Sequence, residues 1–199
     1  MTDSRSTPLR ESDVDPDPLV QLRRWLDDAK DADASHDVVA LATATPDGRP
    51  SVRMVLLKGA DERGLAFFTA YDSRKGSELE ANPRAALLFH WSPLGRQVRV
   101  EGDVERLAEA ESDSYWQTRP VASRRSAAAS PQSAVVASRD ALERAVAETP
   151  EDVARPRRWG GYLLAPSSYE FWQHREDRLH DRLRYRRDGD AWFIERLAP

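Results

Sequence analysis

The feature that most limits what this chain can fold into is a succession of short segments with alternating apolar and polar residues, separated by turns. In one segment Val98 and Val100 alternate with Arg99 and Glu101, as in a strand with one buried face. Short strands with inserted helices, in 199 residues, favour a mainly β fold with helices (α+β), a closed or partly closed antiparallel barrel. The predicted strands are Val38–Thr45, Val52–Lys58, Leu65–Ala70, Ala85–Trp91, Gln97–Leu107, Gly160–Ala165, Tyr169–His174, Arg182–Arg187 and Ala191–Arg196.

Helices are predicted between and before these strands. Asp17-Pro18 can start an amphipathic helix that runs to about Lys30, because apolar residues recur at helical spacing after it. Residues 1–16 are polar and acidic and are predicted to be a flexible N-terminal segment, with residues 17–199 forming a single domain. Three more helices are expected over Ser73–Glu80, Ala108–Thr118 and Ser138–Glu148, and a loop is expected over Arg119–Ser133.

The composition removes several classes of function. Cysteine is absent, which excludes disulfides, thiolate metal sites and cysteine nucleophiles. The four histidines show no metal-ligand spacing, and no nucleophile elbow, P-loop or dinucleotide fingerprint occurs, so an organic cofactor is expected to carry any chemistry and no metal is expected. No run of about 18 apolar residues occurs. We expect a cytoplasmic protein without membrane or nucleic-acid partners.

Positive charge is concentrated near the C-terminus. Between Val153 and Arg187 there are nine basic and four acidic residues, a local net charge of +5 on a chain whose total is −4. Guanidinium groups are fork-shaped donors that suit phosphate, so this segment indicates an anion site. A solvated pair of charged strands explains the same pattern equally well.

A second candidate anion site lies at Ser73-Arg74-Lys75-Gly76, where a helix is predicted to begin. Free backbone N–H groups and two cations would favour phosphate there, whereas cations at a helix start are otherwise unfavourable by roughly 0.3–1 kcal/mol. Tyr115, Arg119 and Ser123, at fourfold spacing, could donate to a second phosphate, although this trio alone is no better than chance.

Together these segments resemble the pyridoxine/pyridoxamine 5′-phosphate oxidase family, flavoenzymes with the FMN-binding split β-barrel fold. The resemblance runs in order from about Asp17 to Pro199. It rests on Arg53–Lys58, Ser73-Arg74-Lys75, Arg96-Gln97-Val98, Arg119-Pro120, Pro131-Gln132-Ser133, Trp159-Gly160-Gly161, Phe171-Trp172-Gln173, Arg178-Leu179-His180-Asp181-Arg182 and Arg196-Leu197-Ala198-Pro199.

The resemblance implies a homodimer with two FMN molecules at the subunit interface. It also implies that Arg178 and His180 face the reacting ring, as catalytic residues. The residues implied to bind FMN are Arg53, Met54, Val55, Leu56, Leu57, Lys58, Phe68, Thr69, Arg74, Lys75, Gln97, Gln132, Ser133, Trp172 and Arg182. Those implied to bind substrate are Lys58, Tyr115, Arg119, Ser123, Arg178, Leu179 and His180.

The implied reaction oxidises pyridoxamine or pyridoxine 5′-phosphate to pyridoxal 5′-phosphate, with O₂ as acceptor and hydrogen peroxide as product. Two alternatives stay open: a related flavin oxidase of secondary metabolism, like the phenazine-biosynthesis members, and a weakly active FMN- or pyridoxal-phosphate-binding protein. The phenazine members tend to lose the lysine equivalent to Lys58, which this chain keeps. The chain departs from the family before the first helix, where only Arg10-Glu11 of an arginine- and tyrosine-bearing segment remains, and at Arg125–Ala128.

Overall fold

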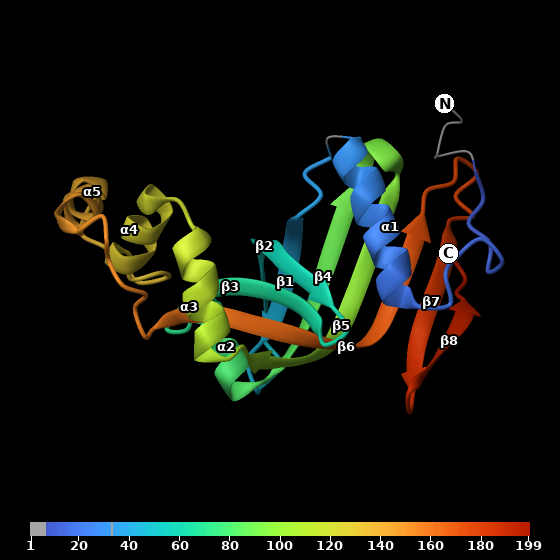
Figure 1. Cartoon of the computed structure of the whole chain (residues 1–199). Coiled ribbons are helices and arrows are strands. Elements are labelled where there is room, and N and C mark those ends of the chain that lie inside the picture. The colour runs from blue at the N-terminus through green and yellow to red at the C-terminus, as the bar shows by residue number, and fades with distance from the viewer. Residues whose placement is uncertain (1–6, 33) are drawn as a thin grey trace.

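The computed structural model describes residues 7–32 and 34–199 (Figure 1). Two of the helices begin at caps that the sequence predicts: Asp17 accepts the N–H of Leu19 at 2.8 Å, and Ser138 accepts that of Ala141 at 3.1 Å. The elements are α1 (Pro18–Asp31), β1 (Val38–Ala44), β2 (Pro50–Asp61), β3 (Gly64–Ala70), α2 (Arg74–Ala81), β4 (Arg84–Trp91), the 3₁₀ turn η1 (Ser92–Leu94), β5 (Arg96–Arg106), α3 (Glu109–Thr118), α4 (Val121–Ala129), α5 (Arg139–Glu148), β6 (Trp159–Gln173), β7 (Asp181–Asp188) and β8 (Ala191–Arg196).

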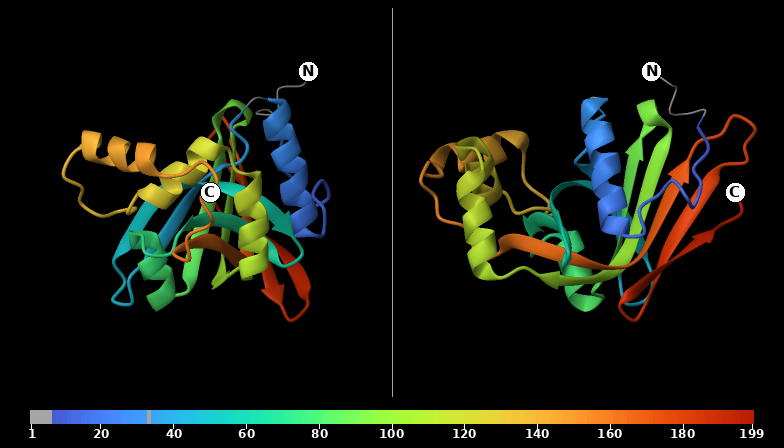
Figure 2. Two further views of the ribbon diagram at one scale, coloured as in Figure 1. Left: turned by 60° about the vertical axis from the view of Figure 1, so that its left-hand side comes forward. Right: turned by 45° about the vertical axis from the view of Figure 1, so that its right-hand side comes forward.

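The strands form one antiparallel sheet that closes on itself. Their order is β3-β2-β1-β4-β5-β6-β7-β8, and an additional pairing of β3 with β6 closes the first six strands into a barrel. Strands β7 and β8 extend from β6 beyond the barrel, and the helices lie around its outside (Figures 1 and 2). The prediction of a split β-barrel with antiparallel strands and peripheral helices is confirmed.

Strand β6 is the element on which closure depends. Its first residues pair with β3, its last residues pair with β7, and most of its length pairs with β5. The sequence predicts two strands here, separated at Pro166, whereas the structure has one continuous strand. The β5–β6 register shifts between Glu101 and Gly102, and this bulge accommodates Pro166, which has no N–H to donate.

Helix α1 covers the main core. Its apolar side is buried through Leu22, Trp25 and Ala29 among others, and the Trp25 ring meets Phe171 of β6 edge-on at 5.2 Å. The alternation predicted for β5 is confirmed, because Val98 and Val100 are buried. These residues form the core of the barrel, and the candidate functional site described below lies outside this core.

A smaller apolar cluster joins the other helices to the barrel. Buried Trp116 of α3 meets Trp159 of β6 at 4.8 Å, and its indole N–H donates to the Val153 carbonyl at 3.0 Å. The predicted loop over Arg119–Ser133 is wrong for its central part, since α4 occupies Val121–Ala129. The alanines of α4 favour a helix, and Arg158 donates to carbonyls at its C-terminal end.

Part of the predicted N-terminal segment is packed against the end of the chain. Leu9 and Val14 are buried in the main core, and Arg196 donates to both carboxylate oxygens of Glu11 at 2.9 Å. Residues 1–6 of the predicted flexible segment lie outside the described residues. Among those described, no helix is long and apolar enough to cross a bilayer.

Leu164→Ala tests the closure of the barrel. Leu164 is fully buried on β6 and pairs with Leu65 of β3, so its truncation should lower the free energy of unfolding by roughly 2–5 kcal/mol. Val135→Ala, at a fully exposed position, is the control and should change it by less than about 0.5 kcal/mol. Urea unfolding measures the free energy of unfolding of both variants. Equally small changes in the two variants would contradict the inferred importance of the β3–β6 pairing.

Candidate active site

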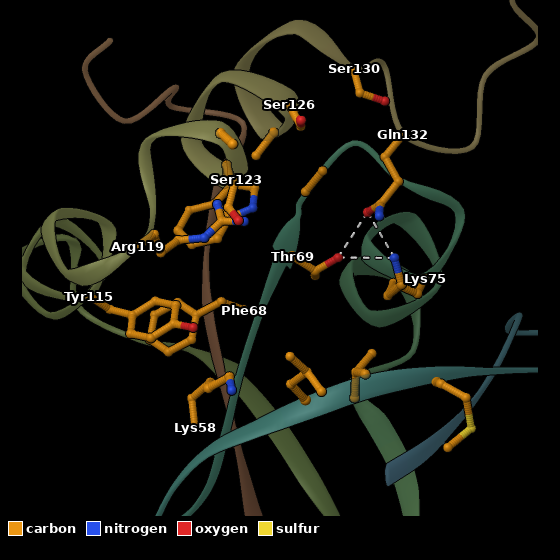
Figure 3. A pocket seen from close by; sticks show the side chains of 17 residues that line it. Lys58, Phe68, Thr69, Lys75, Tyr115, Arg119, Ser123, Ser126, Ser130 and Gln132 are labelled. Atoms are coloured by element: carbon orange, nitrogen blue, oxygen red, sulfur yellow. Dashed lines mark hydrogen bonds between the residues drawn. The ribbon is translucent and has the colours of Figure 1, made fainter. Parts of the chain in front are cut away.

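A cavity of about 590 Å³ opens beside the barrel, between strands β2 and β3 and helices α3 and α4 (Figure 3). Its volume lies in the range of small-molecule and cofactor sites. It collects many of the predicted site residues: Met54, Val55, Leu56, Lys58, Phe68, Thr69, Lys75, Tyr115, Arg119, Ser123 and Gln132. Trp159 of β6 and the small side chains of α4 also line it and were not predicted as site residues; for α4 the reason is that no helix was predicted there.

Lys75 lies at one end of the cavity, held by neutral oxygens. Its Nζ lies 3.0 Å from the Thr69 hydroxyl and donates to the Gln132 side-chain oxygen at 2.9 Å (Figure 3). Ser73 caps α2 by accepting the N–H of Gly76, and its hydroxyl lies 3.3 Å from Nζ. Any Cβ at Gly76 would come 2.1 Å from the Tyr71 carbonyl oxygen, so only glycine allows this close start of the helix.

The charge of Lys75 is poorly compensated. Burial, followed by the nearby Arg53 guanidinium, lowers the pKa of Lys75 to about 8, although Glu78 acts in the opposite direction. A buried cation surrounded mainly by neutral oxygens favours the arrival of an anion. The helix start adds its own positive end, so this part of the cavity suits a phosphate group.

Arg53 and Arg74 are engaged with a carboxylate beside the cavity. Arg53 donates to the Leu41 carbonyl, the Thr43 hydroxyl and Glu78, while Arg74 donates to Glu78 at 2.9 Å. Burial alone would raise the pKa of Glu78, but hydrogen bonds from Ser51, Thr43 and Arg74 lower it to about 2. Neither arginine lines the cavity.

Aromatic rings form the wall of the cavity nearest α3. Phe68 and Tyr115 stack at 3.9 Å, and Trp159 lies nearly parallel to both rings. The Arg119 guanidinium lies 4.5 Å from the Trp159 ring centre. Burial lowers the pKa of Arg119, and its Nη1 is buried with no hydrogen-bond partner within residues 7–32 and 34–199. A buried donor of this kind is normally satisfied, so Arg119 suits a second anion.

Lys58 reaches the cavity from β2 on the side of the aromatic wall (Figure 3). Its Nζ donates to Asp37 at 2.9 Å, and this hydrogen bond holds the pKa of Asp37 below its ordinary value. Lys58, Arg119, Tyr115 and Ser123 therefore share one cavity, as the sequence analysis expected of a second phosphate site.

The remaining predicted residues do not line this cavity. Leu57 is buried in the main core, and Ser133 is exposed next to Gln132. The other predicted residues lie around the C-terminal end of β6, opposite the end that carries Trp159. They are Gln97, Trp172, Arg178, Leu179, His180 and Arg182.

Members of that second group contact one another and neighbouring residues. The rings of Trp172 and His180 lie 4.6 Å apart, and His180 Nδ1 accepts the N–H of Arg175 at 3.0 Å. Arg182 makes a two-pronged ion pair with Glu170, with contacts of 2.8 and 3.1 Å. Arg178 has a φ of 65°, a left-handed conformation that is uncommon for arginine. One chain therefore carries two separate groups of predicted site residues.

An antiparallel barrel with a cationic, aromatic-walled cavity defines a class of protein that can bind a small molecule or cofactor. Residues 26–150 match the family model described as pyridoxamine 5′-phosphate oxidase. Residues 159–199 match the model described as pyridoxine 5′-phosphate oxidase C-terminal dimerisation region.

Similar proteins agree with these matches. The pyridoxine/pyridoxamine 5′-phosphate oxidase 1 of Ralstonia nicotianae is 54% identical, with 100% of this chain and 96% of that protein covered. The pyridoxine/pyridoxamine 5′-phosphate oxidase of Rubrobacter xylanophilus is 53% identical, with 96% of this chain and 91% of that protein covered. The chain belongs to the pyridoxine/pyridoxamine 5′-phosphate oxidase family.

Two solved structures are similar over nearly the whole chain. PhzG from Burkholderia lata 383, in complex with tetrahydrophenazine-1-carboxylic acid, has a TM-score of 0.92 and 38% identity, with 98% of this chain and 100% of that chain covered. A pyridoxamine 5′-phosphate oxidase-related, FMN-binding protein from Nostoc punctiforme has a TM-score of 0.77 and 20% identity, with 97% and 100% covered. The second similarity concerns the fold.

Lys75→Met tests the uncompensated charge. Because the pKa of Lys75 falls from an ordinary 10.5 to about 8, the unfolded chain binds more protons than the folded one between these values. The ligand-free protein should therefore gain about 1–3 kcal/mol of unfolding free energy between pH 8 and 10.5. Lys75→Met should lose this gain. Urea unfolding across the pH range measures it, with Lys30→Met as the control, and a gain that persists in Lys75→Met would contradict the assignment.

Proposed function

We propose that this protein is an FMN-dependent oxidase that converts pyridoxamine or pyridoxine 5′-phosphate to pyridoxal 5′-phosphate, with O₂ as acceptor and hydrogen peroxide as product. The observation that carries the proposal is that one cavity has two separate cationic ends, at Lys75 and at Arg119, with an aromatic wall beside Arg119. A phosphorylated cofactor and a phosphorylated substrate need two such ends. Family membership supports the same activity.

The residues at the Lys75 end fit the phosphate of FMN. Lys75 supplies a buried cation, Thr69 a hydroxyl, and Gln132 an amide in contact with both. Met54, Val55 and Leu56 line the cavity from β2, where a flat ring system would lie. When bound, FMN would supply the two-electron chemistry that the side chains of this protein lack.

The Arg119 end fits the phosphate of the substrate. Arg119 has an unsatisfied N–H, Ser123 and Tyr115 carry hydroxyls, and Lys58 adds a second cation. Holding the phosphate there would orient the pyridine ring between the aromatic wall and the cofactor, which contributes to the rate through positioning.

The two separate groups of site residues support a homodimer. Val52, Met54 and Leu56 leave an apolar stripe exposed on β2, with Met54 60% exposed, and Leu88 of β4 continues it across β1. An apolar face of this kind favours burial against a partner. Because Met54 and Leu56 also line the cavity, a second copy seated there would reach the site.

In such a dimer the partner copy would supply the loop between β6 and β7. Arg178 would stabilise charge at the reacting carbon. His180 accepts a backbone N–H at Nδ1, so its neutral ring carries the proton on Nε2 and can donate one hydrogen bond to the substrate. His180 would thus orient the substrate, and a general-base role is the less favoured one.

Anaerobic mixing tests the function directly. The protein reconstituted with FMN is mixed with pyridoxine 5′-phosphate or pyridoxamine 5′-phosphate while the oxidised-flavin absorbance is followed. We expect bleaching that air reverses, with pyridoxal 5′-phosphate and peroxide formed. Bound flavin that stays oxidised with both substrates would refute the proposal.

Arg119→Gln should raise the KM for pyridoxine 5′-phosphate roughly 10- to 100-fold, since a hydrogen bond to a charged group contributes about 1.5–3 kcal/mol. Binding of FMN, followed by quenching of flavin fluorescence, should be unchanged. The control is Arg124→Gln, on the following helix α4 and outside the cavity lining, and it should leave both constants unchanged. Equal effects of the two substitutions would contradict the assignment of Arg119.

Complementation tests whether Arg178 acts across the dimer. Arg119→Gln and Arg178→Gln should each reduce activity strongly. When the two variants are mixed as subunits, half of the dimers contain one subunit of each kind, and each of these dimers has one intact site of two. The mixture should therefore regain about a quarter of the wild-type activity. The steady-state rate after co-expression, compared with each variant alone, measures this. If Arg178 serves the cavity of its own chain, no site is intact and no activity returns.

A flavin oxidase of secondary metabolism is the second candidate, favoured by the similarity to PhzG over the whole chain. The same anaerobic assay with a reduced phenazine carboxylic acid distinguishes it. Bleaching with that compound and none with the pyridoxine phosphates would establish the second candidate.

A further inference from the structure

The two oxygens of Glu78 contact different parts of the molecule. Oε2 accepts hydrogen bonds from the hydroxyls of Thr43 and Ser51 and from Arg53, on strands β1 and β2. Oε1 accepts the Nε–H of Arg74 at 2.9 Å, within α2. The first oxygen therefore fixes the helix to the barrel, and the second holds only a single arginine of the same helix among the contacts described.

Arg74 is held outside the cavity by this contact. Its side chain is 62% exposed, while Glu78 is 4% exposed. The neighbouring Lys75 lines the cavity, and Arg74 does not. The Arg74 guanidinium therefore stays largely in contact with solvent, and a cation at a helix start gains nothing from the helix dipole. Arg74 can therefore leave Glu78 at small cost.

We propose that Glu78 is a positioning residue that holds Arg74 away from the cavity, and that a phosphate bound at Lys75 takes Arg74 from Glu78 Oε1. The exchange is favourable because a phosphate offers a guanidinium two charged acceptors, whereas Oε1 offers one. Glu78 keeps three donors on Oε2 afterwards, and one of them is the cationic guanidinium of Arg53. This inference rests on the proposed phosphate site at Lys75.

Glu78→Gln separates the two contacts. The amide oxygen of glutamine can still accept hydrogen bonds from Thr43, Ser51 and Arg53. The amide NH₂ then faces Arg74, and it cannot accept a hydrogen bond from the guanidinium. Arg74 is released, and we expect the dissociation constants of FMN and of inorganic phosphate each to fall about threefold or more. Isothermal titration gives both constants, and circular dichroism with thermal unfolding confirms the fold of each variant.

The matched control is the protein that carries Arg74→Gln, a change of a largely exposed side chain. Adding Glu78→Gln to that variant should not increase the affinity for FMN or phosphate, because no arginine is left to release. An unchanged or weaker affinity in Glu78→Gln alone would overturn the proposal. An equal gain in both backgrounds would overturn it as well, since the gain would then come from the loss of negative charge in general.

A direct measurement covers the case in which Glu78→Gln does not fold. Crystal structures of the wild-type protein with and without FMN should show the distance from Arg74 Nε to Glu78 Oε1 growing from 2.9 Å to beyond about 3.5 Å. A contact retained in both structures overturns the exchange. A protein that binds FMN without turnover refutes the proposed oxidase only, while a protein that binds neither FMN nor phosphate refutes both.

Discussion

The pairing of β3 with β6 is the interaction on which the rest of the structure depends. It closes the barrel and brings Phe68 of β3 beside Trp159 of β6, so the aromatic wall exists only because these strands are neighbours. Further along, β6 carries Trp172, whose ring lies against His180. Because an extended strand separates Trp159 from Trp172, the cavity and the histidine loop are held apart within one chain. The proposed site, which combines the two groups, therefore requires a second copy.

The partners of the cations indicate which of them are available to ligands. Arg182 is bound to Glu170 by two contacts, and Arg53 contacts Glu78, so both are engaged with carboxylates of the chain itself. In contrast, Lys75 is surrounded mainly by hydroxyl and amide oxygens, and Arg119 lies against an aromatic ring with one N–H unsatisfied. Burying these charges with little compensation from carboxylates costs free energy that an anionic ligand would restore.

The sequence predicted the local structure well where a local signal exists. Alternation located the strands, and Asp17 and Ser138 marked helix starts as expected. Pro166 was interpreted as a strand break, whereas the bulge at the neighbouring Ser167 of β6 lets the strand continue through the proline. Helix α4 was missed because proline, serine and arginine at its start outweighed the alanine run Ala127–Ala129.

The long-range features could not be read from local patterns. Closure joins β3 to residues of β6 about half the chain away, such as Leu65 to Leu164, and no periodicity encodes such a pairing. Trp159 escaped prediction as part of the cavity wall, since a tryptophan next to two glycines has no distinguishing signal alone. The resemblance to a family gathered residues from both ends of β6 into one site, and only the fold reveals that they lie in two groups within a chain.

The charges at the Arg119 end bear on which ligand the cavity suits. Lys58 and Arg119 bring two cations, and Tyr115 and Ser123 bring two hydroxyls, to the same part of the cavity. A phosphate monoester carries nearly two negative charges at neutral pH and three acceptor oxygens, which matches this set. A carboxylic acid such as the ligand of PhzG carries one charge and two oxygens. With that ligand Lys58 would gain little by leaving Asp37, whereas a phosphate can compete for it. The donor set thus favours a phosphorylated substrate over a carboxylated one.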